Sequence, residues 1–392
     1  MTKTNLGDYQ MGIYVQGMFG GQAPAVTTDL VSLEDRAAGV LTPEALGYIR
    51  PAAGSGATTA ANREAFNQWK IVPRMLNGVA ERDHSTVVLG TAMPTPLIMA
   101  PLGVQTLAHP DGELASARAA AEVGVTYVHS TQAAHTFEQV AEANGDGTRW
   151  YQLYWPSDRD VCESFLERAA ASGYTALMLT LDTVVLAWRP HDLDRGYLPF
   201  LQGVGIANYL SDPAFRAGLV RSPEDDPAGA VLRFGQIYSN PGLSWPDLAF
   251  LREKWDGPIA LKGIQSPADA RMAVDHGIDG VIVSNHGGRQ VDGAIASLDA
   301  LELVVDEVGG EISVLFDSGI RTGSDMVKAL ALGADAVMVG RPYIYGLAMN
   351  GQAGVEHVLR SLLAEFDLTT VLSGHHSQRD LSRASLTRVR PQ

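Results

Sequence analysis

The sequence predicts a single (β/α)8 barrel (TIM barrel), and three of its features lead to that prediction. Short runs rich in apolar and β-branched residues recur along the chain, each ending in polar residues or glycine. Alanine-rich segments lie between most of these runs, and their apolar residues recur at intervals of three and four, as in amphipathic helices. Strands that are apolar throughout and alternate with helices indicate a parallel sheet. Eight such units within roughly 260 residues fit a closed barrel better than an open sheet.

The eight predicted strands are residues 96–104, 126–132, 150–155, 176–183, 258–264, 280–288, 313–319 and 336–342. The clearest of the predicted helices between them are residues 112–123, 266–276 and 323–332. Asp or Ser residues stand near the starts of these segments, as is usual at helix N-termini.

Two segments fall outside the strand–helix repeat. Residues 1–75 contain no predicted barrel strand, and we expect them to form helices that cap the domain. Residues 190–247, rich in Pro, Gly and Asp, form a long insertion after the fourth strand. Because long insertions are usually functional or disordered, we interpret this one as an active-site lid. The whole chain, 1–392, is predicted to be one domain with its barrel over residues 96–365.

Composition excludes several classes of protein. The formal charge of −15 leaves no basic surface to attract a nucleic acid or an anionic membrane. Cys162 is the single cysteine, so no intramolecular disulfide can form. The spacing of histidines and carboxylates predicts no metal site. The chain start lacks the layout of a secretory signal, and the longest apolar stretch is too short to span a bilayer, so we expect a cytoplasmic protein.

Polar residues stand at the ends of five predicted strands, where the active sites of such barrels lie. They are Gln152, Tyr154, Thr180, Asp182, Lys262, Ser284, His286, Arg289 and Asp317. A barrel that needed only stability would have little use for so many polar groups at one end. Their agreement across five strands therefore predicts a catalytic or binding site at this end.

The last two strand ends carry the features of a phosphate site. Residues 317–323 (DSGIRTG) and 340–342 (GRP) combine glycines, two arginines and the start of a helix. Glycine lets the backbone approach a ligand, and the free N–H groups at a helix start favour an anion. The phosphate could belong to a flavin nucleotide or to a phosphorylated sugar. Arg321 and Arg341 could instead be ion-paired surface residues.

The run SNHGGRQ at residues 284–290 closely resembles the active-site signature of the FMN-dependent 2-hydroxy-acid oxidase and dehydrogenase family. The resemblance continues, in family order, through YQLY (151–154), LTLDT (179–183), LKGI (261–264) and DSGIRTG (317–323). It extends from about Tyr48 to beyond Arg341. Within the family the chain is most similar to the lactate monooxygenase branch, through GDY (7–9), PRML (73–76), AWRP (187–190), SLLAE (361–365), Gly103 and the long insertion.

The resemblance implies roles for the catalytic residues. His286 would be the base that acts on the substrate's α-carbon hydrogen or its hydroxyl, because imidazole can accept a proton near neutral pH. Asp182 would stabilise the resulting imidazolium. Tyr154 would donate a hydrogen bond to the substrate. Whether hydrogen leaves as a hydride or first as a proton is left open by the sequence.

Substrate-binding residues are also implied. Arg289 and Arg189 would bind the substrate carboxylate through their planar, paired donors, and Tyr154 and Tyr48 would add hydroxyl groups. Tyr48 could instead be an ordinary helix tyrosine, and Arg189 a loop ion pair. Gln132 occupies a position where relatives commonly carry a bulky apolar or aromatic residue. It could face away as a core amide, or it could line the pocket for a substrate more polar than lactate.

The resemblance further implies FMN as the cofactor. Lys262 would offset the charge of the reduced ring, and Asp317 would meet the ribityl chain. The other residues expected to contact FMN are Pro101, Leu102, Gly103, Ser130, Gln152, Thr180, Ser284, Gly319, Arg321, Gly340 and Arg341. The family also implies a homo-oligomer, a tetramer or an octamer.

The expected reaction is oxidation of a small L-2-hydroxy acid, lactate by resemblance, with O2 as the acceptor. A simple oxidase releases the keto acid and H2O2. A monooxygenase retains the keto acid until it is decarboxylated, giving acetate, CO2 and water from lactate. The long insertion favours retention, because slow product release is a property of lids. Three other interpretations are a non-redox aldolase or isomerase with a phosphorylated substrate, a non-catalytic binding module, and a flavoenzyme that acts on amines or peptides.

Overall fold

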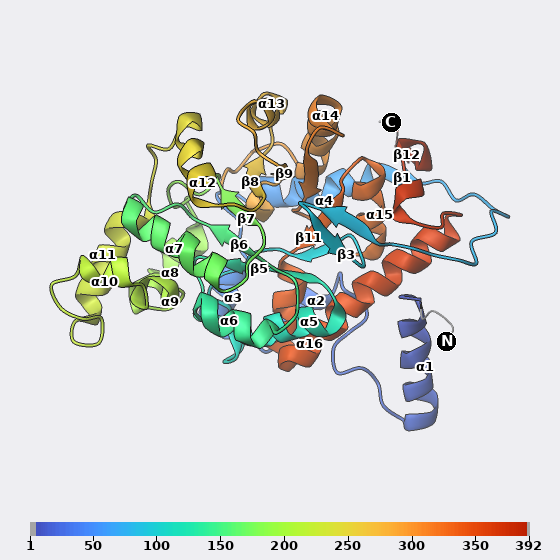
Figure 1. Ribbon diagram of the computed structural model, residues 1–392. Helices are drawn as coiled ribbons and strands as arrows, with labels where there is room; N and C mark the ends of the chain where they lie inside the picture. Colours follow the sequence, from blue (N-terminus) through green and yellow to red (C-terminus); the bar gives the residue numbers. More distant parts are fainter. Residues whose placement is uncertain (1–4, 390–392) are drawn as a thin grey trace.

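The computed structural model describes residues 5–389, and its centre is a closed barrel of eight parallel strands in chain order (Figure 1). The strands are β4 (Leu97–Met99), β5 (Thr126–Ser130), β6 (Arg149–Leu153), β7 (Leu177–Thr180), β8 (Ile259–Ile264), β9 (Gly280–Val283), β10 (Ser313–Phe316) and β11 (Ala336–Val339). The barrel closes where β11 pairs with β4, Met338 opposite Ile98. The predicted fold class is therefore confirmed.

An outer layer of helices surrounds the barrel (Figure 1). Its helices are α5 (Gly112–Val123), α6 (Phe137–Asn144), α7 (Arg159–Ala171), α12 (Leu248–Lys254), α13 (Pro267–Asp275), α14 (Ser297–Val308), α15 (Gly323–Ala331) and α16 (Arg341–Leu372). Helix α5 has the predicted bounds. It ends there because Gly124 adopts the left-handed conformation (φ 77°), and the Gly124 N–H caps the last turn.

The barrel interior is packed with apolar side chains from all eight strands. These residues are Ile98, Val128, Trp150, Met178, Ala260, Ile282, Leu315, Ala336 and Met338. The hairpin of β2 (Thr86–Val88) and β3 (Thr91–Met93) adds Val88 and Met93 to the same cluster. The interior is thus a filled core, as in other barrels of this class.

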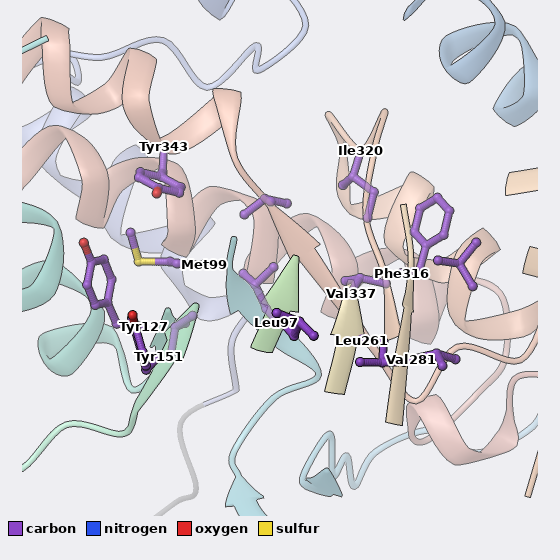
Figure 2. Close-up of a cluster of buried hydrophobic side chains, with 14 of the residues drawn as sticks. Leu97, Met99, Tyr127, Tyr151, Leu261, Val281, Phe316, Ile320, Val337 and Tyr343 are labelled. Atoms are coloured by element: carbon purple, nitrogen blue, oxygen red, sulfur yellow. The ribbon is translucent and has the colours of Figure 1, made fainter. Parts of the chain in front are cut away.

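The neighbouring residues along each strand point outward and pack under the helices. Figure 2 shows part of this second cluster, in which Met99 of β4 lies near Tyr127 of β5 and Tyr343 of α16, while Leu97 of the same strand lies apart from these two rings. All four side chains are fully buried. Burial of one such side chain contributes roughly 1.5–3 kcal/mol, so the two faces of each strand stabilise the barrel from both sides.

The N-terminal region contains helices and one strand. The helices are α1 (Asp8–Gly20), α2 (Leu33–Ala37), α3 (Pro43–Ile49) and α4 (Ala57–Asn67). The strand β1 (Trp69–Ile71) lies outside the barrel and pairs antiparallel with the last strand, β12 (Leu386–Arg388). A purely helical description of residues 1–75 is therefore incomplete, because three residues of this region pair with the C-terminal segment.

The insertion between β7 and β8 is built from short helices. They are α8 (Pro190–Arg195), η2 (Pro199–Gln202), α9 (Ala207–Leu210), α10 (Pro213–Ala217), α11 (Pro227–Tyr238) and η3 (Trp245–Asp247). Asp212 and Asp226 accept hydrogen bonds from backbone N–H groups in the first turns of α10 and α11. Several of the Pro and Asp residues that distinguish this segment in the sequence therefore stand at helix starts.

None of the helices within residues 5–389 is both long enough and apolar enough to cross a membrane. Within the same range, no group of three or more His, Cys, Asp or Glu side chains is arranged to hold a metal ion. The buried thiol of Cys162 packs in α7, and burial raises its pKa.

A buried carboxylate, Asp367 of α16, joins the N-terminal region to the helical layer. Its oxygens accept hydrogen bonds from the Gly7 N–H (2.8 Å) and from Arg82 Nη1 (2.6 Å), and one of them lies 2.9 Å from His84 Nε2.

Loss of one member of a buried charge pair is strongly destabilising, because the charge of the other member is no longer compensated by it. We therefore expect Asp367→Ala to lower the free energy of unfolding by about 3–5 kcal/mol, measured by urea denaturation. The control is Glu311→Ala, which removes an exposed partner of Arg271 and should leave the unfolding midpoint nearly unchanged. Equal midpoints for both variants would contradict this role for Asp367.

Candidate active site

A layer of polar side chains lies directly above the apolar layer inside the barrel. Side chains alternate between the two faces of a strand, so the residue two positions beyond each interior apolar residue also points inward. From β5 to β10 these positions are Ser130, Gln152, Thr180, Lys262, Ser284 and Asp317, all buried. The predicted cofactor residues are thus neighbours because of strand period and register.

This polar layer is internally hydrogen-bonded. Ser130 Oγ donates to Gln152 Oε1 (2.8 Å), and Gln152 Nε2 donates to Thr180 Oγ1 (2.9 Å). On the other side, Lys262 Nζ donates to Ser284 Oγ (3.0 Å) and forms an ion pair with Asp317 (3.1 Å). These bonds fix the side chains before any ligand binds.

Lys262 remains a cation although it is buried. Burial alone would lower its pKa, but the carboxylates of Asp317 and Asp182 outweigh burial and raise that pKa. A positive charge therefore lies at the base of the cavity throughout the neutral pH range. It can stabilise negative charge that develops on a ligand above it.

His286 stands over this layer with its two ring nitrogens in different surroundings. Its Nδ1 lies 2.9 Å from Asp182 Oδ1, and its Nε2 lies 3.5 Å from the Tyr154 hydroxyl. If the carboxylate accepts the Nδ1 proton, Nε2 is left free to take a proton. His286 also has a left-handed backbone (φ 59°), which is rare for a residue other than glycine and typical of functional sites.

The Asp182–His286 pair is held in its reactive ionisation states. Burial would raise the pKa of Asp182, but His286 and Lys262 hold that pKa at about 2. Burial lowers the pKa of His286 below its usual 6.5, although Asp182 opposes the shift. At neutral pH the pair is therefore a carboxylate beside a neutral imidazole, as a general base requires.

Two arginines border the same cavity without a carboxylate partner among residues 5–389. Arg189 Nη2 donates to Gln290 Oε1 (2.8 Å), and the Arg289 guanidinium lies 5.4 Å from the centre of the Tyr48 ring. Burial and the neighbouring cations Arg189 and Arg341 lower the pKa of Arg289 to about 9. An anion bound here would relieve this repulsion.

A second anion site lies at the helix starts after β10 and β11. Arg321 precedes α15, and Arg341 is the first residue of α16. Burial and the charge of Arg341 lower the pKa of Arg321 to about 10. Neither arginine forms an ion pair within the described part of the chain, and Arg341 donates only to backbone carbonyls, Gly287 O among them (2.9 Å). Two unpaired cations beside two helix N-termini are suited to a phosphate.

The structure brings most of the predicted site residues to the wall of one cavity. Those that line it are Tyr48, Pro101, Leu102, Gly103, Ser130, Gln132, Tyr154, Arg189, Lys262, His286, Arg289, Asp317, Gly319, Arg321, Gly340 and Arg341. Asp182, Gln152, Thr180 and Ser284 do not line it directly. Asp182, Gln152 and Ser284 each form a hydrogen bond to a residue that does line it, and Thr180 accepts one from Gln152.

Several residues of the site were not predicted. Phe200 and Tyr238 of the insertion line the cavity, and Gln290 holds Arg189. Gln290 Nε2 also donates to the backbone oxygen of Asp182 (2.8 Å), so it joins the ends of two strands. Gln290 lies inside the SNHGGRQ run, which was a usable signal. Phe200 and Tyr238 carry no local signal, because only the tertiary position of the insertion brings them to the cavity.

Gly103 and Gln132 are in contact at the rim of the cavity. The Val104 N–H donates to the Gln132 carbonyl oxygen (2.9 Å), and a Cβ at residue 103 would overlap that oxygen. Glycine is thus required by this close approach of two backbone segments. Tyr48 lies in helix α3, which agrees with the alternative prediction of a helix tyrosine. It also lines the cavity, as the substrate-binding prediction requires.

Comparison with known proteins identifies what this geometry is similar to. A family model described as FMN-dependent dehydrogenase matches residues 37–388. The FMN-dependent alpha-hydroxy acid dehydrogenase qulF of Penicillium citrinum is 45% identical, over 99% of this chain and 98% of its own length. The L-lactate oxidase of Lysinibacillus sphaericus is 44% identical, over 87% of this chain and 88% of its own. A crystal structure of mandelate oxidase matches with a TM-score of 0.82 and 34% identity, over 93% of this chain and 98% of that one.

The contact at Gly103 gives a prediction about stability. We expect Gly103→Ala to push the 103 and 132 segments apart and to lower the free energy of unfolding by about 1–3 kcal/mol, the usual cost of overpacking. Thermal unfolding measures the change. The matched control is Gly235→Ala in the middle of α11, where a Cβ meets no atom within 4 Å. That variant should be equal or slightly more stable, because alanine favours helix. If Gly103→Ala were as stable as the control, the contact would be readily deformable.

Proposed function

Because the chain belongs to the FMN-dependent dehydrogenase family and is an FMN-dependent 2-hydroxy-acid oxidoreductase, we propose that it oxidises small L-2-hydroxy acids, lactate among them, with O2 as the electron acceptor. The observation that carries the proposal is His286, whose Nε2 faces a cavity that also contains two unpaired arginines and a buried lysine. Family membership removes the non-redox aldolase or isomerase alternative.

The residues present fit FMN. Arg321 and Arg341 lack carboxylate partners within residues 5–389 and would hold its phosphate, with Gly319 and Gly340 allowing close approach. Asp317 would bind the ribityl chain, and Lys262 would lie near the ring. The remaining ring contacts would come from Pro101, Leu102, Gly103, Ser130, Gln152, Thr180 and Ser284. When bound, FMN supplies the two-electron acceptor.

Substrate binding is assigned to the arginines and tyrosines of the cavity. Arg289 and Arg189 would hold the substrate carboxylate, which neutralises the repulsion that lowers the pKa of Arg289. Tyr48 and Tyr154 would orient the substrate through their hydroxyls. Burial raises the pKa of both tyrosines, so each remains a hydrogen-bond donor at neutral pH.

His286 would then accept a proton at Nε2. Conversion of a 2-hydroxy acid to a 2-keto acid releases two electrons and two protons, and the two hydrogen nuclei come from the hydroxyl and from the α-carbon. Nε2 takes one of them as a proton, and the ionised Asp182 at Nδ1 stabilises the imidazolium that forms. The substrate's position between the arginines and His286 would set which carbon reacts.

The insertion favours retention of the keto acid, and this supports a lactate monooxygenase as the finer proposal. Arg189, Phe200 and Tyr238 all belong to the segment between β7 and β8, so this insertion forms part of the cavity wall and its motion would control how fast a product leaves. A retained keto acid can be decarboxylated by peroxide. The balanced reaction is lactate plus O2 to acetate, CO2 and water.

The proposed function is tested by anaerobic addition of L-lactate to the flavin-loaded protein. We expect loss of the flavin absorbance and its return on addition of O2. Acetate with little free peroxide would support a monooxygenase, and pyruvate with stoichiometric peroxide would establish a simple oxidase. If hydroxy acids left the flavin oxidised while amines reduced it, the proposal would be wrong and the amine alternative would stand.

The Asp182–His286 pair predicts the pH dependence of kcat/KM. Protonation of His286 removes the base, so kcat/KM should fall below a pKa that lies under 6.5 and stay constant above it until Arg289 begins to lose its charge near pH 9. Asp182→Asn removes the charge that raises the pKa of His286. The acid limb should therefore move to lower pH while the plateau falls about 100-fold or more. The measurement is kcat/KM between about pH 5 and 9.

The control for this pH profile is Asp275→Asn, an exposed carboxylate in α13, which should leave both the limb and the plateau unchanged. A shift of the limb to higher pH in Asp182→Asn would contradict the assigned charge interaction.

A further inference from the structure

Three buried polar atoms lack partners at one end of the cavity. They are Nε2 and Oε1 of Gln132 and the hydroxyl oxygen of Tyr209, none of which has a hydrogen-bond partner among residues 5–389. Gln132 is only 3% exposed, and Tyr209 is fully buried. Buried polar groups are nearly always hydrogen-bonded in folded proteins. The Tyr209 hydroxyl can serve only one end of the Gln132 amide, so at least one end of the amide lacks a partner.

The surroundings of these atoms are aromatic. Gln132 lines the cavity together with Phe200 and Tyr238, whose ring centres lie 6.1 Å apart. Tyr209 packs behind this wall, with its ring centre 5.0 Å from that of Phe234. The wall continues toward His286, because the ring centre of Tyr238 lies 6.1 Å from that of Tyr154, whose hydroxyl is near His286 Nε2.

The main chain of Gln132 is fixed by two hydrogen bonds, so its side chain starts from a fixed point in the cavity wall. Its N–H donates to Ser130 Oγ (3.2 Å), and its carbonyl oxygen accepts from the Val104 N–H (2.9 Å). The Tyr209 hydroxyl is close enough to the amide to interact with it. One hydroxyl can satisfy only one end of a carboxamide, which has two donors at one end and an acceptor at the other. The other end would still lack a partner.

A charged partner is disfavoured by the electrostatics of this region. The nearby carboxylates are Glu113, which pairs with His135, and Asp212, which pairs with Arg168. His135 and Arg168 are therefore already paired, and the unpaired arginines of the cavity are those assigned to the substrate's own carboxylate and to the phosphate. A second carboxylate at this end would lack a partner among residues 5–389, and the aromatic wall would desolvate an ammonium group. A hydroxyl or a carboxamide is neutral and can both donate and accept, so it matches the Gln132 amide.

We propose that the 2-hydroxy acid carries a neutral hydrogen-bonding group on its side chain, which the Gln132 amide binds at the aromatic end of the cavity. This inference rests on the proposed function and narrows it. Lactate would be turned over as a truncated substrate that leaves the amide unpaired. Gln132 would be a specificity-determining residue.

The experiment compares pairs of substrates with nearly the same shape. L-Glycerate is paired with L-2-hydroxybutanoate, and L-2-hydroxysuccinamate with L-2-hydroxy-4-methylpentanoate. In each pair a polar group replaces an apolar one, at two distances from the α-carbon. For at least one pair we expect kcat/KM to be about tenfold or more higher for the polar member in the native protein. A similar or higher value for the apolar members of both pairs would overturn the inference.

The variant Gln132→Met keeps the length of the side chain and removes its hydrogen-bonding groups. We expect the ratio of polar to apolar kcat/KM to fall about tenfold or to invert. Tyr209→Phe, which leaves the amide in place, should retain a preference for the polar member. An unchanged ratio in Gln132→Met would mean that water alone occupies the site, and it would overturn the inference.

A binding measurement keeps the test independent of turnover. The dissociation constants of the corresponding 2-keto acids can be measured from the change they cause in the flavin absorbance, and they should show the same preference. If no acid of either pair reduces the flavin, the proposed function itself fails and this inference fails with it. If all react but without preference for the polar members, only the inference fails.

Discussion

The two-residue period of the barrel strands is the constraint on which the site depends. Each strand contributes an apolar residue to the interior and, two positions later, one residue to the layer above it. Met178 and Thr180 of β7 show the relation, as do Ala260 and Lys262 of β8. A shift of β8 by one residue against its neighbouring strands would turn Lys262 outward into the helical layer. The filled apolar core therefore specifies the position of the polar layer as firmly as the hydrogen bonds within it do.

The charged residues around the cavity are mainly cations, whereas the protein as a whole is acidic. The chain is acidic overall, with a formal charge of −15, yet four arginines around the cavity have no carboxylate partner among residues 5–389. Lys262 and His286, in contrast, each have one, Asp317 and Asp182. The paired lysine can remain a buried cation without a ligand, whereas unpaired cations favour binding of anions. In the proposed function, this arrangement would separate the groups that act on the reacting atoms from those that hold the phosphate and the carboxylate.

The sequence allowed the barrel and most of the site to be predicted for the same physical reason. Strand ends in a barrel converge on one face, so polar residues that follow apolar runs must meet there, and Lys262, His286 and Asp317 do. Helix bounds were predictable where glycine ends a helix, as at Gly124. The pairing of β1 with β12 was not predictable, because each strand has only three residues and its partner lies at the other end of the chain.

The unpaired polar atoms of Gln132 and Tyr209 could not be predicted from the sequence either. A glutamine at residue 132 suggests either a core amide or a pocket residue, and the sequence alone does not distinguish them. The distinction requires the positions of Val104, Phe200 and Tyr209, which come from three separate segments. The same limit applies to Phe200 and Tyr238, because side chains in an insertion acquire a role only through tertiary packing.

Substrate choice must therefore reside outside the polar layer. Proteins named lactate oxidase and mandelate oxidase share this fold and this family, although their names imply acids of different size. A layer specified by barrel register serves the cofactor and the reacting carbon in the same way for any 2-hydroxy acid. In the proposed function, the side chain of the acid would meet residues of the β5–α6 loop and of the insertion, where packing can change without disturbing the barrel. Gln132 belongs to the first of these segments and Phe200 to the second, so the wall they form together can vary while the polar layer stays in place.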